Sequence, residues 1–423
     1  MHDSLRPFGS NRNDANIDLV FLLYWGVLVF WQNINKGSTG TLADTLLKMV
    51  LISVLTVYYL MHTHSFSLCQ LAFSLLFAVN MTVSFMMEET ASLRMILNYF
   101  FPVLFVFLSL VAGGELQLSR RKTVRFMRGV ILLVSYMAVY AVVTEPETFL
   151  NALSVTNAYG NELSSFFISN HEYGMYLMAG VAACLICLEL DTERPPLLSC
   201  CYLVAIPVFL VNLVLTYSRT SMLATLLFLA VYILCNLKSR YGRLMGAAAV
   251  LTVTVILTVP VLRVYCFEIV MKGNNPAGRD RLAAAAMSLF REGTLPQKLW
   301  GHGVTVTTAV LRTEAGHSSA HNAYLEVILY YGLIGFAVML AFVATHMATL
   351  IRSFKENRVV GVIGFGLLLA CISTILTNTA VLFTSPIDSF FLTVFTVLVP
   401  RYMRNAVEDK VFSLEKEGAK SNA

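Results

Sequence analysis

The chain has 423 residues, of which 57% are hydrophobic and only 13% are charged, and it carries a formal net charge of +5. Its mean hydropathy is +0.70. This composition excludes an ordinary soluble globular protein, in which about 25% of residues are charged. We therefore expect one all-α polytopic membrane domain over residues 1–423, surrounded by membrane lipids and without a nucleic-acid partner.

A helix needs about 17–25 apolar residues to cross a bilayer. Apolar runs of this length, separated by polar or Gly/Pro breaks, predict about twelve transmembrane helices. They are residues 17–31, 45–62, 66–87, 93–112, 124–144, 173–190, 197–215, 220–236, 245–262, 322–351, 360–380 and 388–405. Most Lys and Arg residues fall in alternate connections, which predicts two cytoplasmic termini and a large extracytoplasmic loop at 263–321.

The first long outer segment, residues 145–172, is acidic and rich in Asn and Ser, and it has no Lys or Arg. Such groups can hydrogen-bond a sugar, although a solvated acidic loop explains the same composition. Asn170, His171 and Glu172 stand at the start of the sixth predicted span. They are candidates for the acceptor side of a binding site, or else part of an ordinary helix N-cap.

Arg219 lies in "LTYSRTSML" (215–223), a tight outer turn between the seventh and eighth predicted spans. A charge at the membrane edge costs several kcal/mol unless it is paired or hydrated, so it is by default a candidate functional residue. The alternative is an arginine that reaches lipid phosphate for its own solvation.

The second long outer segment, residues 263–321, is basic. It contains Arg263, Lys272, Arg279, Arg281, Arg291, Lys298 and Arg312 against Glu268, Asp280, Glu292 and Glu314. Within it, "GRDRLAAAAMSLFREG" (278–293) predicts a short amphipathic helix with Leu282, Met287, Leu289 and Phe290 on the membrane. Arg279 and Arg281 are two residues apart and cannot share a helix face, so we expect only one of them to reach a site.

His321 stands at the outer start of the tenth predicted span, in "HNAYLEVILYYGLIG" (321–335). In a continuous helix Gly332 would lie beneath His321 on the same face, with Gly335 close to that face. Glycines at such positions allow another helix to approach. The helix N-terminus disfavours imidazolium, which suits a proton acceptor. The alternative is a helix cap or an interfacial hydrogen bond.

The order of four motifs resembles the O-antigen ligase and polysaccharide polymerase superfamily. The motifs are "SRT" (218–220), "GRDRL" (278–282), "WGHGV" (300–304) and the histidine segment above. The ligase histidine motif is His, then Asn, Ser or Gln, nine residues, Gly, two residues, and Gly or a similar residue. His321, Asn322, Gly332 and Gly335 fit this motif throughout, and His302 lies in the third motif as a supporting residue.

The resemblance implies a GT-C-like, inverting, metal-independent glycosyltransferase on the outer face of the cytoplasmic membrane of a bacterium. Its donor would be an undecaprenyl-diphosphate-linked glycan, and its acceptor a glycan or another lipid-linked molecule. Arg219 and Arg279 match the arginines that hold the donor diphosphate, and His321 matches the residue that activates the acceptor hydroxyl. The loop departs from the ligase spacing of arginine and leucine, which leaves Arg281 open as the alternative to Arg279.

No cofactor or metal is expected. Many other GT-C enzymes carry an acidic, metal-linked motif in the first outer connection, where "QNINKGSTGTLADT" (32–45) offers only Asp44. Arg94 is a third candidate for the diphosphate, or an ion-pair partner of Glu88 and Glu89.

The alternative from another class is a lipid-linked oligosaccharide flippase without catalytic activity. Transporters tend to show internal repeats and ionisable groups at mid-membrane, and the sequence shows neither. Within the enzyme interpretation, ligase and polymerase both remain open.

Overall fold

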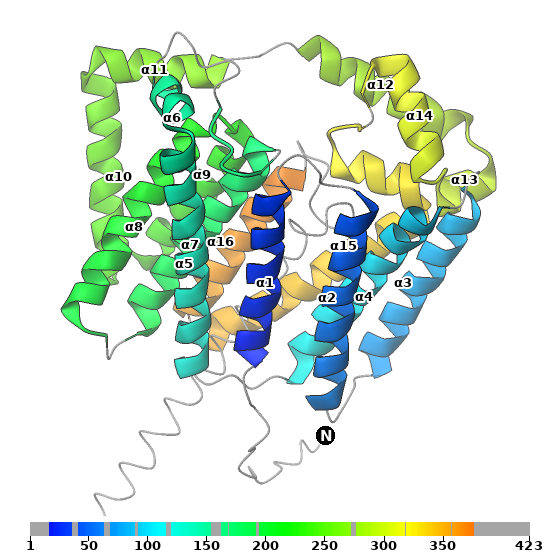
Figure 1. Cartoon of the computed structure of the whole chain (residues 1–423), viewed down its shortest axis with the longest axis horizontal. Helices are drawn as coiled ribbons and strands as arrows, with labels where there is room; N and C mark the ends of the chain where they lie inside the picture. The colour runs from blue at the N-terminus through cyan, green and yellow to red at the C-terminus, as the bar shows by residue number, and fades with distance from the viewer. Residues whose placement is uncertain are drawn as a thin grey trace, which may run out of the picture.

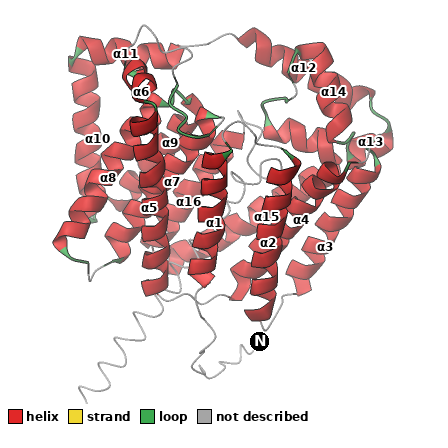
Figure 2. Ribbon diagram, viewed as in Figure 1, coloured by secondary structure: helices red, strands yellow, loops and turns green. Residues whose placement is uncertain are grey.

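The computed structural model describes residues 17–35, 41–62, 68–88, 92–115, 120–153, 162–167, 169–191, 194–271, 276–317, 319–356 and 358–375. Within these ranges the chain forms helices and no strand, which confirms the all-α prediction (Figure 2). The helices are α1 (Ile17–Ile34), α2 (Leu42–His62), α3 (Leu68–Met86), α4 (Leu93–Glu115), α5 (Arg120–Thr144), α6 (Pro146–Ala152), α7 (Asn170–Leu190), α8 (Pro196–Leu215), α9 (Arg219–Asn236), α10 (Arg240–Thr258), α11 (Pro260–Met271), α12 (Pro276–Glu292), α13 (Leu295–Trp300), α14 (Val304–Ala315), α15 (Ala323–Glu356) and α16 (Arg358–Ile375).

Six segments of the described chain are long and apolar enough to cross a membrane, by length and composition. They are Lys122–Thr144, Asn170–Leu190, Pro196–Leu215, Arg219–Asn236, Arg240–Thr258 and Ala323–Thr345. Shorter apolar helices cover Leu19–Ile34, Leu71–Met86, Met95–Leu108 and Gly361–Thr374. The protein is an integral membrane protein. The count of about twelve spans stays a prediction, and the last predicted span, 388–405, lies outside the described residues.

Helix α7 forms the centre of one half of the bundle, because it is buried from Tyr173 to Leu188 among α5, α8 and α9. Its small residues make this possible. A Cβ atom at Gly180 would lie within 2.9 Å of side-chain atoms of Val134 and Phe209. Between membrane helices, where lipid is as apolar as the side chains, such close packing replaces the hydrophobic effect. Helix α10 at the edge (Figure 1) instead exposes most of its apolar side chains, as expected of a helix that faces lipid.

The segment predicted as one large loop, 263–321, is largely helical. Helices α11 to α14 lie at the top in Figure 1, with α6 and α11 on one side and α12, α13 and α14 on the other. The predicted amphipathic helix is α12, but its predicted membrane face is partly wrong. Leu282 is 2% exposed, since α14 packs on α12, and Leu289 and Phe290 also pack on the core. Met287 is exposed.

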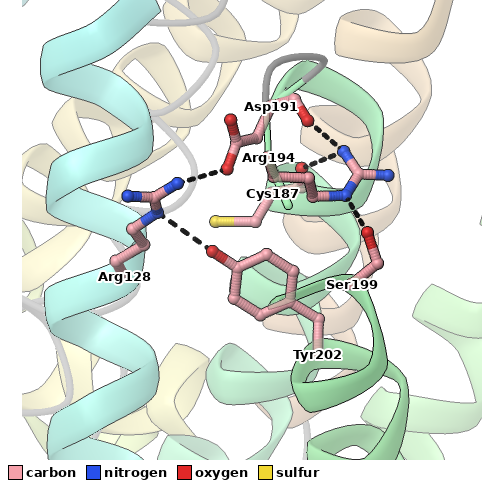
Figure 3. A network of polar contacts seen from close by, with 6 residues as sticks. All are labelled: Arg128, Cys187, Asp191, Arg194, Ser199 and Tyr202. Atoms are coloured by element: carbon pink, nitrogen blue, oxygen red, sulfur yellow. Dashed lines mark hydrogen bonds and ion pairs between the residues drawn. The ribbon is translucent and has the colours of Figure 1, made fainter. Parts of the chain in front are cut away.

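A polar network ties α5, α7 and α8 together at the end of the bundle opposite α6 (Figure 3). Arg128 pairs with Asp191 at 2.6 Å and donates from Nε to the Tyr202 hydroxyl at 3.0 Å. Arg194 donates to the Ser199 hydroxyl at 2.6 Å and to the Asp191 carbonyl. Guanidinium groups suit this junction because each has several N–H donors and can bind two segments at once.

Candidate functional site

The N-terminal part of α15 ends in a break at Gly332, where φ is 70° and ψ is −174°. The predicted continuous stripe from His321 through Gly332 to Gly335 is therefore wrong, because the backbone leaves the helical conformation between them. A Cβ atom at Gly332 would lie 2.2 Å from the Leu299 carbonyl oxygen. The predicted close approach at this glycine is correct. Only glycine combines this φ with a neighbouring backbone so near.

Residues 300–303, here called the wedge, occupy the break. A broken helix leaves carbonyl groups without their usual partners, and inside a membrane each costs several kcal/mol. The His302 N–H donates to the Leu329 carbonyl at 2.7 Å. Gly301 has φ 98°, and a Cβ atom there would lie 2.2 Å from the Tyr330 carbonyl oxygen. The wedge therefore packs against the break at Gly332, here also called the kink, through backbone atoms of both segments.

Three polar side chains of α3 and of the turn after it, here called the α3 ladder, bind the wedge, the break in α15 and the start of α14. Asn80 and Ser84 are four residues apart in α3 and share one helix face, and Glu88 lies two residues beyond the end of that helix. The Asn80 amide donates to the Tyr331 carbonyl at 3.3 Å, and the Ser84 hydroxyl donates to the Trp300 carbonyl at 2.7 Å. Sequence reasoning missed Asn80 and Ser84, although two polar residues four positions apart within an apolar span were a usable signal, and it considered Glu88 only as a partner of Arg94.

Glu88 ends the α3 ladder at the N-terminus of α14. Its carboxylate accepts hydrogen bonds from the Val304 N–H at 2.5 Å, the Thr305 N–H at 3.1 Å and the Tyr99 hydroxyl at 2.6 Å. A negative charge is favoured at this end of a helix. The side chain of Arg94, the predicted ion-pair alternative for Glu88, lies outside what is described; its backbone lies in the first turn of α4.

His302 is buried inside this assembly. It is 4% exposed, and its Nε2 has no hydrogen-bond partner among the described residues. A Cβ atom at Gly293 would lie 2.7 Å from that nitrogen, so the end of α12 covers the ring. Burial and, less strongly, the charge of Lys298 lower the pKa of His302. The folded protein therefore favours the neutral form of the His302 imidazole.

The protein is expected to lose stability as the pH falls below 6.5, the ordinary pKa of histidine. The folded state resists protonation of His302, whereas the unfolded chain accepts the proton near pH 6.5, so acid favours unfolding between the two pKa values. Thermal unfolding in lipid on either side of pH 6.5 measures this effect. His302→Asn should flatten the pH dependence, and His317→Asn, at an exposed position, should retain it. Equal pH profiles for both variants would refute the assignment.

His321 lies one residue before the cap of α15. Asn322 is the cap, because its Oδ1 accepts from the Tyr324 N–H at 3.0 Å and the Leu325 N–H at 3.2 Å. The interpretation of His321 as a helix cap is therefore wrong. His321 is exposed and has φ 49°, a left-handed conformation that is strained for a residue with a side chain. Its N–H donates to the Ser319 hydroxyl at 3.1 Å.

Glu326 binds the backbone of the segment that precedes α15. It is 1% exposed, and its Oε1 accepts from the Ala320 N–H at 2.8 Å. Sequence reasoning also missed Glu326, although an acidic residue one turn inside an apolar span indicates by itself a candidate functional residue. Glu326 and Asn322 together hold the exposed His321 on a rigid support.

A second group of contacts surrounds Arg219, the first residue of α9. The Asn170 amide donates to the Thr216 carbonyl at 2.8 Å. His171 Nδ1 lies 2.9 Å from the hydroxyl oxygens of both Ser218 and Ser221. The N-cap position of α7 is held by Ser169, so Asn170 is not the N-cap proposed as its alternative role. The structure brings Asn170 and His171 together with the Arg219 turn.

The other predicted site residues are placed as follows. Glu172 is partly exposed in the first turn of α7, and Arg281 is exposed on α12. For Arg279 only the backbone, in α12, is described. His302, His321, Asn322, Gly332 and Gly335 lie along the wedge and α15, whereas Arg219 belongs to the group around α7.

Asp44, predicted to lie in the first outer connection, is instead in the first turn of α2 and forms a buried ion pair with Lys48 at 2.6 Å. Within the described ranges no three His, Cys, Asp or Glu side chains gather in a way that could hold a metal ion.

The fold and the two groups of contacts around Arg219 and α15 define a helical integral membrane protein with polar networks between its helices. The family model described as O-Antigen ligase matches residues 204–340. This confirms the resemblance to the O-antigen ligase and polymerase superfamily for the part of the chain that contains Arg219, His302 and His321. No curated protein matches the chain.

Proposed function

We propose that the protein is a membrane glycosyltransferase of the O-antigen ligase or polysaccharide polymerase type. It moves a glycan from an undecaprenyl-diphosphate-linked donor to an acceptor hydroxyl on the outer face of the bacterial cytoplasmic membrane, with inversion and without a metal. The observation that carries this proposal is the exposed His321, held in a strained conformation within the segment that matches the ligase family. Strained backbone conformations cluster at functional sites.

The reaction assigns one role to each group. The acceptor oxygen attacks the anomeric carbon opposite the diphosphate, and the bond between that carbon and the phosphate oxygen breaks. The hydroxyl proton passes to the His321 imidazole, which acts as the general base. Undecaprenyl diphosphate leaves, and guanidinium groups stabilise the negative charge that develops on it.

Arg219 and Arg279 are the proposed diphosphate contacts, with Arg94 as a third. Helical spacing places position 279 on the same face of α12 as Leu282 and Ala286, three and seven residues later, which are both buried. Arg281 is exposed. This spacing supports Arg279 rather than Arg281. On the acceptor side Glu172 remains a candidate contact, because Asn170 and His171 already bind the Arg219 turn.

The test uses the purified protein in lipid with an undecaprenyl-diphosphate-linked oligosaccharide, in EDTA, and follows the release of undecaprenyl diphosphate. Wild type should release it. Arg279→Gln should lower the initial rate by about 10²-fold, the typical cost of one lost charge-stabilising donor. The matched variant Arg281→Gln, at the exposed position, should stay within about threefold.

Two results would change these conclusions. If Arg281→Gln were the damaging variant, the assignment within α12 would reverse. If wild type released nothing with any acceptor, the glycosyltransferase would be excluded. The flippase alternative, which the family match does not favour, would then be tested by lipid transport in vesicles. Products that grow from the donor alone identify a polymerase, and products that need a separate acceptor identify a ligase.

A further inference from the structure

Tyr217 is the strained residue nearest to Arg219. It lies in the turn between α8 and α9, is buried, and has φ 52°. The left-handed region is unfavourable for a residue with a side chain, because Cβ comes too close to the following carbonyl oxygen. Such a conformation persists only where the surrounding contacts over-determine it.

The backbone of this turn is fixed from several directions. The Leu163 N–H donates to the Leu215 carbonyl at 3.0 Å, and the Ser218 N–H donates to the Thr216 hydroxyl at 3.1 Å. The contacts of Asn170 and His171 with the same turn come from α7. The turn is therefore rigid, and Arg219 is the charged side chain that it presents.

The Tyr217 hydroxyl joins the turn to two further segments. It donates to the Ala152 carbonyl at 2.5 Å and lies 3.0 Å from the Tyr265 hydroxyl. Tyr265 lies 3.1 Å from the same carbonyl. Each phenol has one hydrogen, so Tyr217 donates to Ala152 and Tyr265 donates to the oxygen of Tyr217 or of Ala152. Burial raises the pKa of Tyr265, which keeps this hydrogen in place.

The three partners come from distant parts of the chain. Ala152 ends α6 in the first long outer segment, and Tyr265 lies in α11, at the start of the second. Their meeting point at Tyr217 is two residues before Arg219. A shift of either outer segment would thus move the turn that presents the guanidinium.

We propose that the paired hydroxyls of Tyr217 and Tyr265 position Arg219 for the donor diphosphate and couple it to α11. Both tyrosines are positioning residues that act through Arg219. The proposal rests on the proposed function, because it assumes that Arg219 binds the diphosphate.

The test removes one hydroxyl that lies far from the turn in sequence. Tyr265→Phe keeps the aromatic packing, whose ring centroids are 6.2 Å apart, and deletes only the hydrogen bond. The dissociation constant of undecaprenyl diphosphate should rise about 3- to 10-fold, as expected for one hydrogen bond. Tyr241→Phe removes a hydroxyl bound to Arg194 at the other end of the bundle and should leave binding within twofold.

A double-mutant cycle separates positioning from general damage to the fold. In an Arg219→Gln background, Tyr265→Phe should weaken binding by less than about twofold, because the residue through which it acts is already absent. An unchanged dissociation constant for Tyr265→Phe, or its full effect in the Arg219→Gln background, would overturn the proposal. Failure of the proposed function gives a distinct result, because wild type would then neither bind undecaprenyl diphosphate nor release it from the donor. In that case the positioning role of Tyr217 and Tyr265 would also be refuted.

Discussion

His321→Ala is expected to lower the release of undecaprenyl diphosphate by about 10²- to 10⁴-fold, the usual contribution of a positioned general base. The imidazole is the proposed acceptor of the hydroxyl proton. Its exposure and strained φ of 49° place it before the helix rather than within its packing. The substitution should therefore change the rate much more than the stability. Initial rates and thermal unfolding of the same preparation measure the two effects.

His317 provides the matched control. Its ring lies 5.6 Å from that of His321, and it is exposed in the same segment. His317→Ala should keep the rate within about threefold, because one general base is sufficient for this reaction. A His321→Ala protein with more than a tenth of the wild-type rate would show that His321 is not the base. If both variants lost the same fraction of the rate, the cause would be a changed conformation of residues 317–321 rather than the loss of the His321 imidazole.

Gly332→Ala is expected to cause the largest loss of stability of any glycine substitution in α15. A positive φ of 70° alone costs about 1–3 kcal/mol for alanine. The added Cβ would also meet the Leu299 carbonyl oxygen at 2.2 Å, so the wedge would have to move. That movement would break the hydrogen bond from His302 to Leu329. A lower unfolding temperature and a poor yield of monodisperse protein are the expected results.

Gly26→Ala is the control for Gly332→Ala. Gly26 lies inside α1, and a Cβ atom there would meet nothing within 4 Å. Alanine in a helix interior is more favourable than glycine by about 1 kcal/mol, so this variant should be as stable as wild type or slightly more stable. If Gly332→Ala unfolded at the wild-type temperature, the kink would not require glycine.

Several features of the protein follow from the sequence alone because they depend on local pattern. Apolar runs predicted the helical membrane class, since a backbone in lipid must satisfy its own hydrogen bonds. The order of motifs around Arg219 and His321 led to the family that matches residues 204–340. The close approach at Gly332 was also predicted, because a glycine within a membrane helix lets a neighbouring backbone come near.

Other features depended on which parts of the chain meet. Asn80 and Tyr331 are 251 positions apart, and nothing local in the sequence shows that one satisfies a carbonyl of the other. Amphipathic spacing predicted α12 but could not distinguish a lipid-facing side from a protein-facing one, so Leu282 was assigned to the membrane. The kink at Gly332 was missed because a break in a membrane helix is stable only when distant groups accept or donate the freed hydrogen bonds. The sequence therefore determines the helices and the candidate site residues, and the tertiary structure decides which backbone conformations can hold those residues in place.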